Sequence, residues 1–369
     1  MPNHEKEILY SIALTLLKNV GSISSRKLIT HFGSAENVFK ASAKSILNIP
    51  GIGHKILKEL RNKEYLLEAE KIIACCLQAN IDLLIQHQTN FPYRLQRVFD
   101  SPLVLYFLGN ANLNATKMVG LVGTRRATEY GRKVCNQIAT ESAGNDVHFV
   151  SGLAYGIDSY IHQACIEQNI PNFAVLANGF HFIYPYQHRK MADQIKENVG
   201  LISEYPPHIK PDPRHFPMRN RIIAGLVDAL VVVEAAEKGG ALITAEYANN
   251  YHREVFAVPG GIDKPFSVGC NQLIAAHKSN IFVGTNRFFE QLNWDKPKGT
   301  FQKKILFDSP DFTQNETAIL SALHMLGDLS FDELAWKTQI PLNEIALIIL
   351  NLEFNGYIKA IAGNRYSLT

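Results

Sequence analysis

The feature that most constrains this chain is a pair of consecutive segments in which an apolar strand runs into a glycine-rich loop and then a helix. The first runs from a strand at Met118–Val122 into Gly123-Thr124-Arg125-Arg126. The second runs from a strand at His148–Val150 into Ser151-Gly152-Leu153-Ala154-Tyr155-Gly156, and its helix starts at Ile157-Asp158. Two such units in succession predict parallel strands joined by right-handed crossovers.

The two glycine-rich loops are expected to lie side by side at the carboxyl edge of one sheet. Open α/β sheets bind ligands at that edge, and the helix N-termini there favour anions. Glycines let backbone N–H groups approach phosphate oxygens, and Arg125 and Arg126 add guanidinium donors. We therefore interpret the two loops as a phosphate cradle. The alternative is a pair of tight turns in an α/β core, with arginines that only meet solvent.

Short apolar segments alternate with helical ones over residues 80–293, which is typical of a doubly wound, mainly parallel sheet. Strands at Ile81–Ile85 and Val104–Leu108 extend this sheet at its start. After the glycine-rich units we expect strands at Phe173–Ala177, Leu201–Ser203, Ala229–Val233, Val255–Val258 and Asn280–Val283. The helices between them include Gln187–Asn198, Arg219–Leu226 and Leu242–Asn250.

Three further loops are predicted at the same edge of the sheet. The first contains Asn178-Gly179, with Tyr184-Pro185 just beyond it, and the last ends in Lys238-Gly239-Gly240. The middle loop starts Glu204-Tyr205-Pro206-Pro207, and its prolines predict a stiff, non-helical arm that leads to residues 214–221.

In this arm Arg214, Arg219 and Arg221 surround Phe216, next to Asn220. Cations interleaved with an aromatic ring suit a single nucleic-acid strand, because every base has a face to stack on and every link carries a charge. Two alternatives stay open. Phe216 could instead plug the core under a loop, and the arginines could pair with the acidic region around Glu204 and Glu234.

Residues 1–79 predict a separate helical domain whose helices are joined by glycine turns. The segment Leu47–Lys55 has the pattern of a helix-hairpin-helix turn, and Asn19–Lys27 looks like a degraded copy of it. Residues 1–80 hold 11 Lys and Arg against 7 Asp and Glu, a net charge of +4 that favours contact with DNA. A purely structural αα-hairpin is the alternative.

Residues 294–312 are mostly polar and are interpreted as a linker to a small domain at 313–369. Helices are expected there at Glu316–Leu326, Phe331–Thr338 and Leu342–Asn355, followed by a hairpin at 357–368, which is the winged-helix pattern. Residues 309–369 carry a net charge of −4, and the third helix has no Lys or Arg. A protein-interaction or regulatory role is therefore favoured over reading of a DNA groove.

Several classes of protein are excluded by what the sequence lacks. The five cysteines include no C-x-x-C pair, and no signal peptide is evident, so we expect a protein of the reducing cytoplasm. No apolar run has the length of a membrane span, and the 13 histidines and the cysteines show no metal-ligand spacing. Neither a Walker motif nor a dinucleotide G-x-G-x-x-G occurs, so no cofactor is expected.

The order of these blocks resembles the DNA processing protein A (DprA/Smf) family over about residues 80–285. The resemblance rests on six segments: Val122–Arg125, Ser151–Asp158, Tyr184-Pro185, Phe216–Leu226, Gly240–Ala245 and Val255–Gly260. It implies an extended Rossmann-like fold that binds single-stranded DNA without sequence preference. Binding is expected to be independent of ATP, because the sequence has no Walker motif. It also implies a homodimer that protects incoming DNA and loads the RecA recombinase during natural transformation.

The family's DNA contacts carry over to the loops at Gly123–Arg125 and Ser151–Gly156 and to the arm at Phe216–Arg221. The candidate DNA-binding residues are Gly123, Thr124, Arg125, Arg126, Ser151, Gly152, Ala154, Gly156, Arg214, Phe216, Arg219, Asn220, Arg221, Lys238 and Gly240. The chain departs from the family pattern at Thr124 and Gly239, where serine is usual. It also departs after Asn271-Gln272-Leu273-Ile274, where Ala275-Ala276 replaces Gly-Ala in the half of the sheet that forms family dimers.

An enzyme that hydrolyses the nucleotide N-glycosidic bond is the alternative function. Related Rossmann-like hydrolases use a P-G-G-x-G-T-x-x-E loop, and the corresponding stretch here runs from Lys238 to Glu246. The proline and the last glycine of that loop are missing, and Glu246 follows Thr244 by two positions instead of three. One position on a helix is a rotation of about 100°, so no catalytic residue is expected. Asp158, at the start of a helix, is interpreted as a residue that orders the preceding loop.

Overall fold

The structure is a computed structural model that describes residues 3–294 and 312–369. It divides into two compact units, Met1–Ile281 and Phe282–Thr369. These units differ from the predicted domains, because the amino-terminal helices share a unit with the sheet. The boundaries at 79/80 and 293/294 stay predictions, and most of the predicted linker, residues 295–311, lies outside the described residues.

The first unit is built on one nine-stranded sheet with the order β1-β2-β6-β5-β4-β3-β7-β8-β9. From β6 to β9 all neighbours are parallel, whereas β1 and β2 are antiparallel to each other and β2 is antiparallel to β6. The strands are β1 Asp82–Ile85, β2 Val104–Gly109, β3 Lys117–Val122, β4 Val147–Ser151, β5 Asn172–Leu176, β6 Gly200–Ser203, β7 Ala229–Val232, β8 Glu254–Ala257 and β9 Asn280–Ile281. The predicted extended, doubly wound sheet is confirmed.

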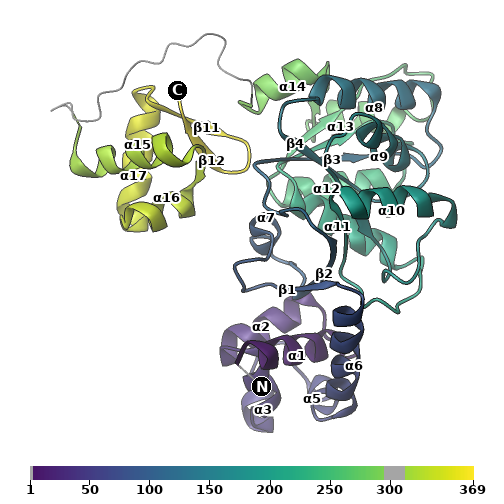
Figure 1. Cartoon of the computed structure of the whole chain (residues 1–369), viewed down its shortest axis with the longest axis vertical. Coiled ribbons are helices and arrows are strands. Elements are labelled where there is room, and N and C mark those ends of the chain that lie inside the picture. Colours follow the sequence, from purple (N-terminus) through teal and green to yellow (C-terminus); the bar gives the residue numbers. More distant parts are fainter. Residues whose placement is uncertain (1–2, 295–311) are drawn as a thin grey trace. The chain divides into compact units, whose positions relative to one another are not determined.

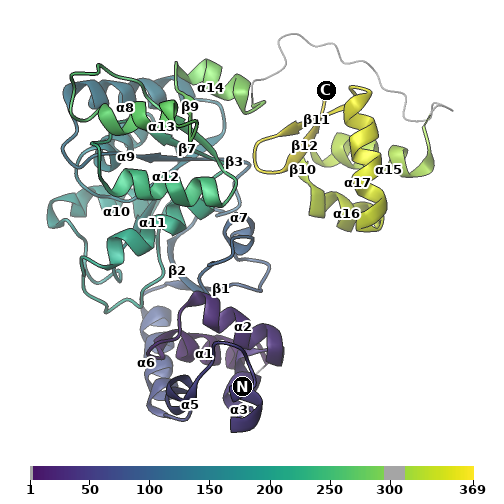
Figure 2. The ribbon, with the colours of Figure 1, turned by 180° about the vertical axis from the view of Figure 1, so that it is seen from behind.

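Helices cover both faces of this sheet, as a parallel sheet of apolar strands requires. Figure 1 shows α8, α9 and α10 on the near face, and Figure 2 shows α11 and α12 on the other. The helices between the parallel strands are α8 Glu129–Ser142, α9 Ile157–Glu167, α10 Arg189–Asn198 with the preceding 3-10 turn η1 Tyr186–His188, α11 His215–Leu226, α12 Gly240–Asn250 and α13 Val268–Ala275.

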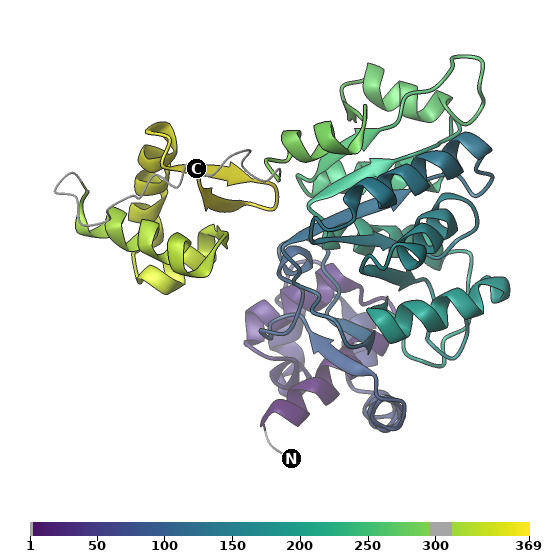
Figure 3. The ribbon, with the colours of Figure 1, turned by 45° about the horizontal axis from the view of Figure 1, so that its top comes forward.

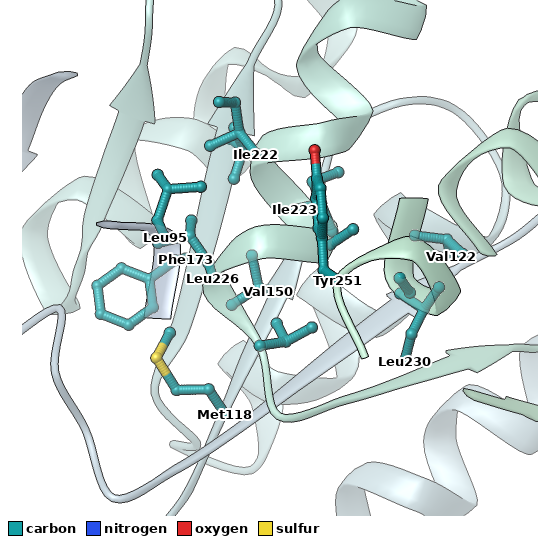
Figure 4. Close-up of a cluster of buried hydrophobic side chains, with 14 of the residues drawn as sticks. Leu95, Met118, Val122, Val150, Phe173, Ile222, Ile223, Leu226, Leu230 and Tyr251 are labelled. Carbon is teal, nitrogen blue, oxygen red and sulfur yellow. The ribbon is translucent and has the colours of Figure 1, made fainter. Parts of the chain in front are cut away.

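The main core lies between the sheet and the layer of α11 and α12. Figure 4 shows Ile222 and Leu226 of α11 near Val150 and Phe173 of the strands, all of them buried. Successive residues of a strand face opposite sides, so Ala174 and Leu176 belong instead to a second cluster under α10. The sheet is therefore held from both sides.

The strand order places a switch point at the centre of the sheet. From β3 the chain moves outward through β4, β5 and β6, and α11 then carries it back to β7 on the other side of β3. The loops that follow β3 and β7 consequently diverge to opposite faces. In open α/β sheets the crevice outside the carboxyl ends of such strands binds ligands.

The amino-terminal helices lie at the β1–β2 end of the sheet (Figure 3). Their apolar residues share one buried cluster with Ile85, Val104 and Tyr106 of these strands. Arg26, in the predicted degraded hairpin copy, donates to the carbonyl of Val98 at 2.8 Å, so this copy packs against the sheet unit. The helices are α1 Asn3–Leu16, α2 Ser22–Phe32, α3 Ala35–Lys40, α4 Ala43–Leu47, α5 His54–Leu60 and α6 Glu64–Gln78, and α7 Tyr93–Gln96 follows β1.

The second unit contains the three helices and the hairpin expected near the carboxyl end. Its elements are α14 Thr285–Gln291, α15 Gln314–Leu326, β10 Leu329–Ser330, α16 Phe331–Thr338, α17 Leu342–Phe354, β11 Ile358–Ile361 and β12 Arg365–Leu368. Capping boxes from Thr313 to Glu316 and from Ser330 to Glu333 start α15 and α16. The short strand β10 pairs with β12 and was not predicted. The winged-helix assignment stays a prediction.

A buried ion pair ties α7 to the amino ends of β3 and β7. Arg94 Nε lies 2.6 Å from Asp228 Oδ1 and Arg94 Nη2 lies 2.8 Å from Oδ2, with both side chains almost fully buried. Asp228 also accepts from the backbone N–H of Met118 at 3.0 Å. Removing one partner would leave a buried charge without compensation.

We therefore expect Arg94→Met to lower the free energy of unfolding by about 3 kcal/mol, measured by urea denaturation. Lys71→Met is the matched control, because Lys71 pairs with Glu68 on the surface of α6. Its effect should be below about 1 kcal/mol. An Arg94 variant as stable as the control would show that the buried pair is dispensable.

Candidate nucleic-acid interface

A cavity of about 930 Å³ opens at the switch point, at the carboxyl edge of the sheet. Its walls come from the loops after β3, β4 and β7 and from the first turns of α11 and α12. The lining residues include Gly123, Thr124, Arg125, Ala154, Asp158, Tyr184, Phe216, Arg219, Asn220, Lys238, Gly239 and Gly240. Segments separated by more than a hundred residues in sequence thus form one site.

The loop after β3 is anchored by Glu234, at the end of β7. The carbonyl of Glu234 accepts from the backbone N–H of Thr124 at 2.7 Å. The Glu234 carboxylate, itself buried, accepts from the Thr128 N–H at 2.8 Å and from the Thr128 hydroxyl at 2.6 Å, at the start of α8. Arg125 lies between these anchors and is exposed, so its guanidinium is presented from a fixed backbone.

Asp158, in the first turn of α9, fixes the conformation of the loop after β4. Its buried carboxylate accepts from the backbone N–H of Ala154 at 3.4 Å, as expected from its place at the start of the helix. Burial raises the pKa of this carboxyl group, and the nearby charge of Arg219 opposes the rise. Gly156 has a φ of +77°, and a Cβ there would lie 2.2 Å from the carbonyl oxygen of Thr124. A side chain at this position would push the two glycine-rich loops apart.

Arg219 forms part of the cavity lining, and its guanidinium is held by hydrogen bonds to the protein. Its guanidinium donates to the carbonyls of Gly152, at 2.7 Å, and Val175, and the residue is 4% exposed. Burial lowers its pKa to about 10, so it stays charged at neutral pH. Nε and Nη1 of Arg219 donate to the protein, and a direct contact of this arginine with phosphate stays a prediction.

Phe216 lies in the first turn of α11, which corrects the predicted non-helical arm. The helix begins at His215, and Pro217 fits in its first turn because N–H groups there have no partner within the helix. The guanidinium carbon of Arg125 lies 5.1 Å from the centre of the Phe216 ring. The ring of Tyr184 lies 5.5 Å away on a plane tilted by 59°. Phe216 is half-buried at the cavity wall and so is not a core plug.

The remaining wall is the loop that ends in Lys238-Gly239-Gly240, where all three residues are exposed. The Asn220 amide donates to the carbonyl of Gly240 at 3.2 Å and fixes the start of α12 against α11. Asn220 therefore positions the loop, and Lys238 is a cation on the cavity rim.

The structure brings most of the predicted residues to this cavity, with six exceptions. Arg126 is exposed beside it, and Arg214 pairs with Asp212 at 2.7 Å outside it. Ser151, Gly152 and Gly156 lie in the supporting layer, where the buried hydroxyl of Ser151 donates to the carbonyl of Leu121 at 2.6 Å.

Arg221 is the sixth exception and needs a correction. It is 3% exposed and donates to the Glu204 carboxylate and to the carbonyl of Asp100. The alternative of ion pairing is therefore right for Arg221, and the interpretation as a phosphate contact is wrong. Gly152 has a structural reason to be glycine, because a Cβ there would lie 2.4 Å from Arg219 Nη2. This glycine makes room for the buried arginine, and its role in opening amides to phosphate stays a prediction.

Two residues that shape the cavity, Glu234 and Tyr184, were not among the predicted site residues. Glu234 appeared only as an ion-pair candidate, and its anchoring of the β3 loop depends on the neighbouring positions of β3 and β7 in the sheet. Tyr184 belongs to a segment that was singled out, and its ring could have been proposed as a stacking partner.

Among residues 3–294 and 312–369 no group of three or more His, Cys, Asp and Glu could hold a metal ion. Within the same ranges no helix is long and apolar enough to cross a membrane. Glu246, the carboxylate considered for hydrolysis, pairs with Lys278 at 3.0 Å on the surface.

The family model of DNA recombination-mediator protein A matches residues 82–293. The chain is 30% identical to Protein Smf of Synechocystis sp. over 397 residues, which cover 99% of each chain. The chain therefore belongs to the DNA recombination-mediator protein A family. The members of this family are DNA-binding mediators and not enzymes, so the hydrolase alternative is set aside.

Two solved structures resemble this fold. One is DNA processing protein A from Streptococcus pneumoniae, with a TM-score of 0.63 and 29% identity, covering 77% of this chain and 97% of that one. The other is DNA processing protein A from Helicobacter pylori, described for its single-stranded DNA binding mode. It matches with a TM-score of 0.53 and 26% identity, over 58% of this chain and 95% of that one.

If Arg125 binds a phosphate, each such contact should contribute roughly 0.7 to the slope of log affinity against log salt. Arg125→Ala should therefore weaken oligo-dT binding and flatten that slope by about this amount. Arg126→Ala is the matched control, because it removes the same charge one residue away, outside the cavity lining. The slope of log affinity against log salt should change less for Arg126→Ala than for Arg125→Ala.

Phe216→Ala in the same assay should weaken binding by about 1–3 kcal/mol with little change of slope, because stacking carries almost no salt dependence.

Equal slope changes for Arg125→Ala and Arg126→Ala would indicate a diffuse charge effect and contradict a phosphate contact at Arg125.

Proposed function

We propose that this chain binds single-stranded DNA at the switch-point cavity as a mediator of DNA recombination. The observation that carries the proposal is the arrangement of Arg125 over the ring of Phe216, in a cavity rimmed by glycine-rich loops. A cation and an aromatic ring side by side can take a phosphate and a base of one strand. The relative from Helicobacter pylori supports the choice of a single strand.

Binding in this cavity is proposed to be independent of sequence and of ATP. The candidate contacts are a ring face, guanidinium and ammonium groups and loop amides, and these groups do not distinguish one base edge from another. No Walker motif is present in the sequence, so nothing in the chain couples DNA binding to nucleotide hydrolysis.

The finer role rests on the family resemblance. We propose that the protein acts in the cytoplasm as a homodimer, protects incoming DNA during natural transformation and loads RecA onto it. The sheet ends at the short strand β9, whose two residues are exposed, so the neighbouring edge is open to pairing.

The carboxyl-terminal unit is proposed to bind a protein. On α17 the side chains of Leu347, Leu350 and Phe354 are 65%, 61% and 91% exposed and recur at the spacing of one helix face. Helix α17 carries two glutamates and neither Lys nor Arg. An exposed apolar stripe on an acidic helix suits a protein surface better than a DNA groove.

The purified protein should bind labelled oligo-dT more tightly than duplex DNA, and equally well with EDTA and without nucleotide. The expected reason is that backbone amides, side-chain cations and the Phe216 ring make the proposed contacts, and none of these groups needs a metal ion or a nucleotide. A mixed-sequence oligonucleotide of the same length is the control for sequence independence. Loss of oligo-dT binding on removal of divalent ions or nucleotide would contradict the proposed cavity contacts.

Ending the chain near Asp308 should leave single-strand affinity within about twofold of that of the full chain, well below a tenfold loss of about 1.4 kcal/mol. The removed residues 309–369 carry a net charge of −4 and no basic helix. Fluorescence anisotropy with oligo-dT measures this, with circular dichroism as the control for folding. A loss of tenfold or more would show that this unit contacts DNA.

A further inference from the structure

Three tyrosine rings are exposed next to the cavity. Tyr184 lines the cavity and is 46% exposed, while Tyr155 and Tyr186, which lie outside the lining, are 43% and 71% exposed. They come from two loops at the same sheet edge, the loop after β4 and the segment that leads into α10. Large aromatic side chains that gather on an exposed surface commonly mark a binding site.

Direct contacts join the two loops into one surface. The Tyr155 hydroxyl donates to Gln187 Oε1 at 2.7 Å, and the Tyr155 and His188 rings meet edge to face at 5.1 Å. His188 Nδ1 lies 2.8 Å from the carbonyl oxygen of Leu153, which identifies this nitrogen as the donor. We call the surface formed by Tyr155, Tyr184 and Tyr186 the tyrosine surface. Contacts within the protein hold its two loops together.

The tyrosine surface continues directly from the cavity. Tyr184 contacts Phe216 at one end, and Tyr186 follows it by two residues in η1. Gly156, next to Tyr155, packs on the backbone of Thr124 and Arg125. The rings thus extend the Phe216 site outward.

Two cations follow the tyrosines without an obvious structural purpose. Arg189 and Lys190 are exposed in the first turn of α10, which contains no acidic residue. Positive charge near a helix N-terminus is unfavourable for the helix, so these residues do not serve its stability. The nearest acid along the helix, Asp193, pairs with Lys196 at 3.4 Å. Within the described ranges neither Arg189 nor Lys190 takes part in an ion pair.

We propose that Tyr155, Tyr184, Tyr186, Arg189 and Lys190 form a second segment of the single-strand path, continuous with the Phe216 cavity. The tyrosine rings stack on further bases of the same strand, and the two cations bind its phosphates. This inference rests on the proposed function, since it extends the strand that occupies the cavity. Alternating rings and cations recognise single-stranded nucleic acid of any sequence.

The test measures the affinity of the full chain for oligo-dT of increasing length, from about 4 to about 16 nucleotides, a range typical of single-strand binding sites. Tyr186→Ala should match the wild-type protein on the shortest oligomers, which fill only the cavity. On longer oligomers it should bind about fivefold or more weakly, because one base no longer has a ring to stack on. Tyr186→Phe should restore the affinity, since it keeps the ring.

A strand of the same length that consists of abasic sites separates stacking from charge. Wild type and Tyr186→Ala should bind it equally, because it offers no base to stack. Arg189→Ala with Lys190→Ala should flatten the salt slope by roughly 0.7 for each phosphate that these two cations bind. Lys196→Ala is the matched control on the same helix and should leave the slope unchanged, because its charge is paired.

Failure of this inference and failure of the proposed function give different results. A wild-type protein that binds no oligo-dT of any length would overturn both. Normal length-dependent binding by Tyr186→Ala and by the Arg189 and Lys190 variant would overturn only the second segment. The second segment would also be overturned if Tyr186→Ala weakened binding to oligo-dT and to the abasic strand equally, because the ring would then not act by stacking.

Discussion

The geometry of the cavity depends on one buried cation, Arg219. Its guanidinium joins the carbonyls of Gly152 and Val175, which end two neighbouring strands, and it lies near the buried carboxylate of Asp158. Burying a charge is costly unless hydrogen bonds and an opposite charge compensate it, so each partner must hold its place. Asp158 in turn accepts from the N–H of Ala154. The loop after β4 is thereby fixed by side chains from α9 and α11.

Glu234 fixes the loop after β3 by hydrogen bonds, as Arg219 fixes the loop after β4. Its carbonyl and its carboxylate hold Thr124 and Thr128, on either side of Arg125. The two loops meet where Gly156 packs on Thr124. Buried charged groups therefore hold the two loops in place, and the exposed cations Arg125 and Lys238 remain available to a ligand. This separation lowers the entropy cost of binding, because the contacting groups start from an ordered backbone.

The sequence indicated the sheet, its loops and the edge where they meet, because strand periodicity and glycine turns are local signals. It could not indicate which arginine of the Arg219-Asn220-Arg221 block is available to a ligand. The prolines of the loop that starts at Glu204 suggested a non-helical arm, whereas α11 includes the end of this segment from His215 onward. On a helix, residues two apart point about 200° apart. Arg219 therefore lies at the cavity, while Arg221 turns toward Glu204, and both are buried by partners remote in sequence. The sequence also could not indicate why position 152 is a glycine, because its small size accommodates Arg219, which is remote in sequence.

The contact between Arg125 and Phe216 has a consequence for how affinity arises. In this structure the guanidinium lies over the ring, at 5.1 Å. In the proposed site a base that stacks on this face would displace the guanidinium, which would then turn to a phosphate, so one favourable contact would be exchanged for two. A cation over an aromatic ring contributes about 0.5–1 kcal/mol at exposed sites, so the net gain from a single base is reduced by this amount. Tight binding must then come from several nucleotides held at once, along a path longer than the cavity or across more than one copy of the chain. Repeated weak contacts along one strand would make affinity depend on the length of the strand more than on its sequence, as the proposed function requires.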